Sequence, residues 1–316
     1  GPALIDHGVR AKWEEGALVS AERAGDAEWV RRVHLDVAGV IPSIEEAEAF
    51  LADASPGKRA ALVEKLLKDP RYAEHWADVW SGVIVGFDKE QRVQGARNLG
   101  AQDLRELLAA NVPYDELARK VITIEGTTSE RAGAAMMMPA AGTEPEEEKP
   151  AGLASYLVRL NREAGRGDFP KAVAGKLTRA FMGVQIQCAQ CHDHPFDRWT
   201  QEEFYGMASF FTEVTVRRDP DQDPKQVFIV EDKIRPVRPR QKAARGSDLT
   251  IPDSKSGPIK AAFLESGKGA ETGVKRRETF AKYMTSPDNL QFARMCVNRY
   301  WANFFGRGIV DPVDDF

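Results

Sequence analysis

The sequence predicts a mainly α-helical protein, multi-helical, with a small antiparallel β unit inserted before a C-terminal helical segment. Apolar residues recur at helical spacing through most of the chain, and helix-capping signals precede several of these stretches. After Glu213 the period shifts from helical towards two. With 316 residues the chain can bury a full core and form two units, because one domain commonly spans roughly 100–200 residues.

The first part of the chain is expected to form helices joined by short polar links. Asp26 is expected to cap the second helix and Gly39 to end it. Ser43 and Glu46, three residues apart, have the spacing of a capping box for the third. The predicted helices cover residues 11–24, 27–38, 44–51, 58–68, 71–85, 99–110 and 113–123.

The second part mixes helices, strands and loops. Glycines, prolines and an acidic run predict a mobile surface loop over residues 127–150, and four prolines predict an extended connection over residues 235–258. Thr200 and Glu203 form a second predicted capping box. Helices are predicted over residues 152–164, 170–181 and 290–305, and strands over residues 213–218 and 226–231.

Chemistry-bearing residues concentrate in one short stretch, which runs Cys188-Ala189-Gln190-Cys191-His192-Asp193-His194. The spacing Cys-x-x-Cys-His is the one that covalent attachment of a c-type haem requires. Cys188 and Cys191 would form thioethers to the porphyrin, and His192 would be the proximal iron ligand. Candidates for the sixth ligand are His34, His75, Met182 and Met207.

The same atoms permit other interpretations. Cys188, Cys191, His192 and His194, with Asp193 and Asp197 nearby, could hold zinc or another transition metal. The chain would then be a non-haem metalloprotein, a hydrolase or carbohydrate-active enzyme, although no known hydrolytic motif accompanies the cluster. A third alternative is a surface scaffold with a structural Cys-x-x-Cys clasp. The sequence assigns no catalytic residue and leaves open whether the protein is an enzyme.

Composition excludes two classes of partner. With 44 Lys+Arg against 48 Asp+Glu, the formal net charge is −4, and no basic stripe predicts nucleic-acid binding. No apolar run approaches the roughly 20 residues that span a bilayer. Gly1-Pro2 looks like the remnant of a cleaved tag, so a native signal peptide would have been removed.

Several stretches together resemble a family. DAEWVRRVHLDVAG at 26–39, CAQCHDHPFDRW at 188–199 and FYGMASFF at 204–211 resemble the planctomycetal cytochrome-type domain of unknown function. Residues 276–316, with SPDN at 286–289 and VNRYW at 297–301, resemble the start of its companion domain of unknown function. The resemblance implies an exported protein, periplasmic or on the cell surface.

These observations together give the expected organisation. Residues 1–212 form a helical cytochrome-type domain, residues 213–275 a small β unit and linker, and residues 276–316 the truncated start of the companion domain. The expected function is that of an exported protein that carries haem c and has an electron-transfer or redox role. Its expected partner is a redox protein or a cell-surface component.

Overall fold

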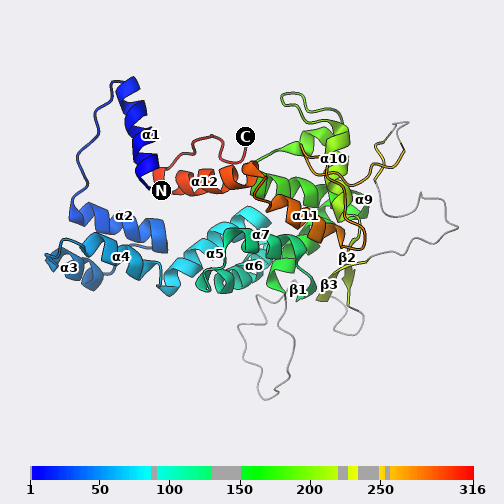
Figure 1. Cartoon of the computed structure of the whole chain (residues 1–316). Coiled ribbons are helices and arrows are strands. Elements are labelled where there is room, and N and C mark those ends of the chain that lie inside the picture. Colours follow the sequence, from blue (N-terminus) through cyan, green and yellow to red (C-terminus); the bar gives the residue numbers. More distant parts are fainter. Residues whose placement is uncertain (1, 87–90, 130–150, 220–226, 234–248, 253–256) are drawn as a thin grey trace, which may run out of the picture. The chain divides into compact units, whose positions relative to one another are not determined.

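The computed structural model describes residues 2–86, 91–129, 151–219, 227–233, 249–252 and 257–316 (Figure 1). It is mainly α-helical with a small antiparallel sheet, so the predicted fold class is confirmed. The chain forms two compact units, Gly1–Leu67 and Lys68–Phe316. These units divide the chain at a different place from the three predicted segments. Within the part that the structure describes, no helix combines the length and the apolar character needed to cross a membrane.

Unit 1 consists of four helices: α1 (Pro2–Glu15), α2 (Asp26–Ala38), α3 (Ile44–Ala52) and α4 (Lys58–Leu66). The helix predicted over residues 11–24 is wrong, because α1 ends at Glu15 and Ala17 adopts a positive φ of 50°. The predicted stop at Gly39 is confirmed by its left-handed conformation, and Ser43 and Glu46 form the predicted capping box. Asp26 is the first helical residue and not the cap, which is Gly25.

Unit 2 is built from seven longer described helices and three short 3₁₀ turns around one apolar core. The longer helices are α5 (Pro70–Val85), α6 (Gln91–Ala109), α7 (Tyr114–Thr123), α9 (Ser155–Met182), α10 (Gln201–Ala208), α11 (Arg276–Met284) and α12 (Leu290–Phe305). The 3₁₀ turns are η1 (Gly152–Ala154), η2 (Ile186–Gln190) and η3 (Ser209–Phe211). Trp80, Phe181 and Phe280 are among the largest fully buried side chains, which makes this core strongly aromatic.

Helix α9 was predicted as two helices, over residues 152–164 and 170–181. The structure agrees that the helix is interrupted between these ranges, because Gly165 adopts a non-helical conformation with φ of 70° and ψ of 168° and separates two helical stretches of α9. Pro170 follows five residues later. Glycine adopts positive φ without steric penalty, so the chain changes direction there and then resumes helical geometry.

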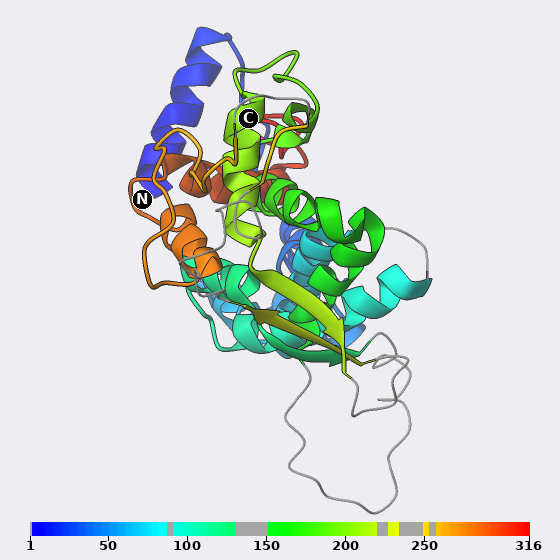
Figure 2. The same ribbon diagram turned by 90° about the vertical axis from the view of Figure 1, so that its right-hand side faces the viewer.

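Three strands form one antiparallel sheet in the order β1-β3-β2 (Figure 2). Strands β2 (Val214–Arg218) and β3 (Val227–Asp232) confirm the predicted β unit. Strand β1 (Gly126–Ser129) was not predicted, since its residues were assigned to the start of the 127–150 loop. It pairs with β3 more than 90 residues away, with Thr128 opposite Phe228. The rest of that predicted loop lies outside the described residues, and so does most of the 235–258 connection.

Helices α11 and α12 pack into the core of unit 2. Phe280 and Met295 are fully buried, and the Phe292 ring stacks on Tyr114 with a centroid separation of 4.9 Å. The Gln291 Nε2 atom donates a hydrogen bond to the carbonyl oxygen of Met182 at 2.9 Å. The C-terminal segment therefore contributes to the folding of the part that precedes it.

Candidate functional site

The end of α9 delivers the chain to the Cys-x-x-Cys-His motif. Gly183 caps α9 in a left-handed conformation with φ of 65°, and its N–H donates to the carbonyl oxygen of Arg179. A Cβ atom at this position would lie 2.7 Å from Phe316 Cδ2, so glycine is required by packing as well. Phe316 also donates its N–H to the Gly183 carbonyl oxygen at 2.8 Å. The C-terminal segment thus holds the chain a few residues before the motif.

The 3₁₀ turn η2 carries the first cysteine of the motif and leads directly into the second. Such a turn has three residues per turn, so residues i and i+3 share a face. Ile186 and Ala189 are fully buried and anchor its inner face. Cys188 lies in the turn and Cys191 directly follows it, and both are exposed and unpaired. Both thiols are therefore accessible to solvent.

The Gln187 side chain packs closely on the backbone of α9 and holds η2 there. Gln187 donates from Nε2 to the carbonyl oxygen of Gly175 at 3.2 Å. A Cβ atom added at Gly175 would lie 2.9 Å from Gln187 Cγ, which is closer than real contacts allow. The sequence offered no signal for Gly175 or Gln187, since a glycine inside an apolar helix has no distinguishing spacing. Gly175 nevertheless decides how closely the motif approaches the core.

The residues after the motif form a loop with many internal hydrogen bonds. His194 N–H donates to the Trp199 carbonyl oxygen at 2.8 Å, and Trp199 itself is buried. The Asp193 carboxylate accepts from the N–H of Gln201 at 2.8 Å, at the start of α10. Gln201 Nε2 reaches back to the carbonyl oxygen of Gln190 at 3.1 Å. The predicted capping box of Thr200 and Glu203 is confirmed and begins α10 at this point.

The two histidines have different hydrogen-bonding states. His192 Nδ1 lies 2.7 Å from the carbonyl oxygen of Asp193, so this nitrogen carries the proton and donates. The lone pair of His192 is then on Nε2, the arrangement typical of metal-ligating histidines. His194 Nδ1 instead accepts from the N–H of Phe196 at 3.3 Å, which places its proton on Nε2. His192 is prepared to be a ligand, whereas His194 must change tautomer or lose a hydrogen bond first.

The proposed non-haem cluster is not assembled in the described residues. Among them, no group of three or more His, Cys, Asp or Glu side chains is arranged to hold a metal ion. Asp193 accepts the Gln201 N–H, and Asp197 accepts the N–H of Arg198 at 2.7 Å. A four-ligand site made from Cys188, Cys191, His192 and His194 would therefore require the loop to rearrange.

The candidates for a sixth haem ligand are all engaged elsewhere. His34 is buried in unit 1 and its Nδ1 donates to the carbonyl oxygen of Val30 at 2.8 Å. Met207 is fully buried, and its sulfur accepts the N–H of Leu264 at 3.3 Å. Met182 is also buried, and His75 packs edge-on against Trp76. The structure singles out none of them.

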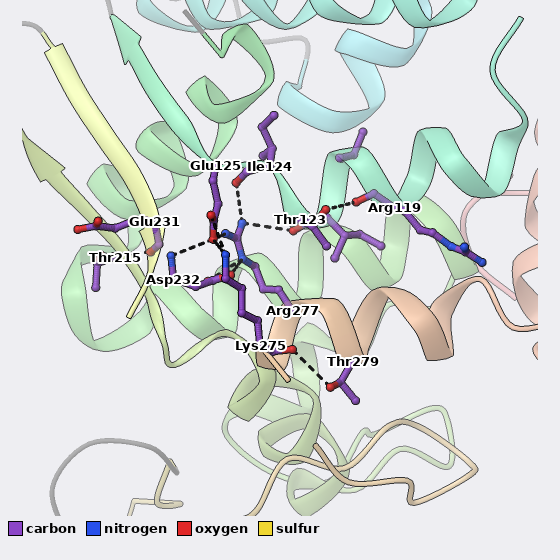
Figure 3. A network of polar contacts seen from close by, with 12 residues as sticks. Arg119, Thr123, Ile124, Glu125, Thr215, Glu231, Asp232, Lys275, Arg277 and Thr279 are labelled. Atoms are coloured by element: carbon purple, nitrogen blue, oxygen red, sulfur yellow. Dashed lines mark hydrogen bonds and ion pairs between the residues drawn. The ribbon is translucent and has the colours of Figure 1, made fainter. Parts of the chain in front are cut away.

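A second cluster of charges lies inside unit 2 (Figure 3). Arg277 at the start of α11 is buried, and its Nε lies 2.8 and 3.0 Å from the two carboxylate oxygens of Asp232 on β3. Its Nη1 donates to the carbonyl oxygens of Ile122 and Ile124 at the end of α7. Glu125 accepts from Lys275 at 2.7 and 2.8 Å.

This network is a structural element. Burial raises the pKa of the Asp232 carboxyl, and the neighbouring Arg277 opposes that rise. For Glu125, burial is the largest single effect and raises the pKa, but the hydrogen bonds with Lys275 and Asp232 and the charge of Lys275 together lower it. Each charge has a partner of opposite sign, so the network joins α7, β3 and α11 by ion pairs.

Comparison with known families and proteins completes the description. A family model named PSCyt2, a protein of unknown function (DUF1549), matches residues 4–216. A second model named PSD1, a protein of unknown function (DUF1553), matches residues 276–316. Both matches confirm the resemblances drawn from the motifs. No curated protein and no solved structure matches the chain.

Proposed function

The chain belongs to the PSCyt2 family of unknown function, and we propose that it is an exported protein that carries haem c on Cys188 and Cys191 for electron transfer or another redox role. The observation that carries this proposal is the contrast between the two histidines. His192 holds its lone pair on Nε2 directly after two exposed thiols, which is the donor set of a covalently attached haem.

The residues present fit the attachment of this group. Cys188 and Cys191 are exposed, so their sulfur atoms can react with porphyrin vinyl groups without unfolding of the turn. Asp193 orients the His192 ring through its carbonyl oxygen, and its carboxylate ties the loop to α10. Buried Ile186 and Ala189 keep the turn on the protein during attachment. Haem held in this way would supply one-electron transfer at its iron.

The chain's own residues would set the properties of such a centre. The hydrogen bond from His192 Nδ1 to the Asp193 carbonyl increases the basicity of Nε2, which favours the oxidised metal. A further iron ligand would then come from a partner or solvent, since Met182 and Met207 are buried in the core of unit 2 and the rings of His34 and His75 make other contacts. A redox partner protein or a cell-surface component would then meet this exposed face.

The non-haem alternative receives less support. Zinc or another transition metal would need His194 as the fourth ligand, and the observed bond between His194 Nδ1 and the Phe196 N–H opposes that. A scaffold with a structural clasp would explain the two cysteines. It gives no reason for the orientation of His192.

The deciding experiment is expression of the chain in an exported form together with a haem-attachment system. A denaturing gel stained for covalent haem is expected to show a band at the mass of the protein. Cys188→Ala and Cys191→Ala should each leave the haem more easily extracted, because one thioether is lost. Cys296→Ala is the matched control, and it should stain as the unmodified chain does.

Histidine variants test the ligation separately. His192→Ala should retain the covalent stain and change the absorption spectrum, because the imidazole binds the iron and not the porphyrin edge. His194→Ala should leave the spectrum unchanged. Absence of covalent haem in the unmodified exported chain would defeat the proposal. Metal content that falls equally in the two motif cysteine variants and the two histidine variants would favour the zinc alternative.

A further inference from the structure

A pocket of about 470 Å³ opens in unit 2 between helices α5, α9 and α12. This size lies within the range of roughly 300–1,000 Å³ that is usual for small-molecule sites. Gly82, Val83 and Gly86 form the α5 side without bulky polar groups. The side chains that determine its chemistry are those of Lys176, Arg179, Gln187, Arg299 and Asp314.

The pocket carries an excess of positive charge. Three cations line it against one carboxylate, which leaves a net charge of +2. Asp314 is bound to Arg179, with Nε and Oδ2 2.7 Å apart. Among the residues that the structure describes, no carboxylate forms an ion pair with Lys176 or Arg299. Asp314 acts electrostatically on both cations without forming an ion pair with either, so their charge is only partly compensated by the protein.

The Arg299 side chain is held in position, but not all of its hydrogen-bond donors have a partner. Its guanidinium lies 5.6 Å from the centroid of the Trp80 ring, and its Nη2 donates to the Ala180 carbonyl oxygen at 3.3 Å. Its Nε is buried and has no hydrogen-bond partner. An arginine offers five N–H donors in a rigid fork that suits carboxylate, sulfate and phosphate groups. Packing has thus ordered this side chain without using all of its donors.

Lys176 is held in an unfavourable environment. Burial, followed by the like charges of Arg159 and Arg179, lowers the pKa of Lys176 to about 8. The carboxylates of Glu163 and Asp314 oppose this shift. The charged groups around Lys176 are Arg159, Glu163 and Arg179 on α9, Arg299 on α12 and Asp314 in the C-terminal segment. Helix α5 contributes no charged residue to the pocket wall. At neutral pH the ammonium is still charged and poorly compensated.

We infer that this pocket binds the oxyanion group of a small ligand, a carboxylate or a sulfate or phosphate group, through Lys176 and Arg299. Two half-buried cations without carboxylate partners destabilise a fold, and such arrangements are retained mostly where binding requires them. An anion in the pocket would offset this positive charge and would accept charge-assisted hydrogen bonds from these two side chains. Gln187 lines the pocket and directly precedes Cys188, so the ligand would lie beside the cysteine motif. The inference does not depend on haem attachment.

The test uses the haem-free chain, so its result is independent of the haem proposal. Calorimetric titration at pH 7 and constant ionic strength is carried out with sulfate, inorganic phosphate, acetate and succinate, with chloride as the reference. Saturable binding of one class is expected. Preference for acetate and succinate identifies a carboxylate ligand, and preference for sulfate and phosphate identifies a tetrahedral oxyanion. Absence of saturable binding by all four probes overturns the inference.

Two variants on the same helix provide the matched comparison. Lys176→Met is expected to weaken binding about tenfold or more, because it removes a charge-assisted donor. Lys171→Met removes a lysine that pairs with Asp168 at 2.7 Å and does not line the pocket, so binding should be unchanged. Equal affinity of Lys176→Met and the unmodified chain, with both folded by circular dichroism, would also overturn the inference.

The pH dependence provides a second readout. Sulfate stays fully ionised between pH 7 and 9.5, so a change in its affinity reports on the protein. Affinity should fall by about tenfold or more over this range as Lys176 loses its proton, since its pKa is about 8. In Lys176→Met the residual affinity should not change with pH. A flat profile in the unmodified chain contradicts the assigned role of Lys176.

Discussion

Replacing Arg277 by methionine should strongly destabilise unit 2. The Arg277 side chain has 0% exposure and that of Asp232 has 3%, so the change leaves a carboxylate buried without its partner. The carbonyl oxygens of Ile122 and Ile124 lose donors at 3.3 and 2.8 Å as well. Breaking a buried ion pair in this way costs about 3–5 kcal/mol.

This loss should be visible in calorimetry. Unit 2 spans Lys68–Phe316, and for units of this size each kcal/mol lowers the melting temperature by about 2–4 °C. The transition of unit 2 should therefore move down by on the order of 10 °C. Arg277→Lys is the matched control: it keeps a charge but not the planar fork, and its loss should be smaller.

Two further measurements separate an uncompensated charge from simple loss of packing. The double variant Arg277→Met with Asp232→Leu should recover part of the stability, because no charge is then left buried. Protonated Asp232 is neutral, so the destabilisation in Arg277→Met should grow as the pH rises through the raised pKa of Asp232. A melting temperature for Arg277→Met within about 2 °C of the unmodified chain would refute the reasoning.

The remaining predictions concern the pocket and the motif. Lys176→Met should stabilise the ligand-free chain at pH 7 by about 1–3 kcal/mol in urea denaturation, since one pKa unit corresponds to about 1.4 kcal/mol. Between pH 8 and 10.5 the Lys176 side chain binds more protons in the unfolded chain than in the native chain. The stability of the unmodified protein therefore rises over this pH range. The stability gain of Lys176→Met should vanish at the upper end of it. Gly175→Ala should lower the free energy of unfolding by about 1–3 kcal/mol, because the added Cβ displaces the Gln187 side chain. It should also speed alkylation of Cys188, the next residue. An unchanged alkylation rate would show that the position of η2 does not depend on this contact. In haem-free protein Cys188 and Cys191 should be alkylated much faster than Cys296, because burial raises the pKa of the Cys296 thiol to about 11. Mass spectrometry measures the three rates. Equal rates would contradict the exposed placement of the motif.

Local signals determined most of the secondary structure. The capping boxes at Ser43 and at Thr200 were correct because each depends on side chains three residues apart. The stop at Gly39 was correct because a left-handed residue at a helix end is a local requirement. Where the local signal was weak, as over residues 11–24, the helix was misplaced, and strand β1 was missed because its pairing partner is remote in the sequence.

For the candidate site, the sequence by itself determined the Cys-x-x-Cys-His spacing and the family. Both follow from the order of residues alone. The folded structure decided which hydrogen bonds the two histidine rings make, with His192 Nδ1 donating to the Asp193 carbonyl oxygen and His194 Nδ1 accepting the Phe196 N–H. It also decided that Lys176 and Arg299 share one pocket although they are more than 120 residues apart. Burial and charge compensation arise only when separate helices pack, so no linear pattern reveals them.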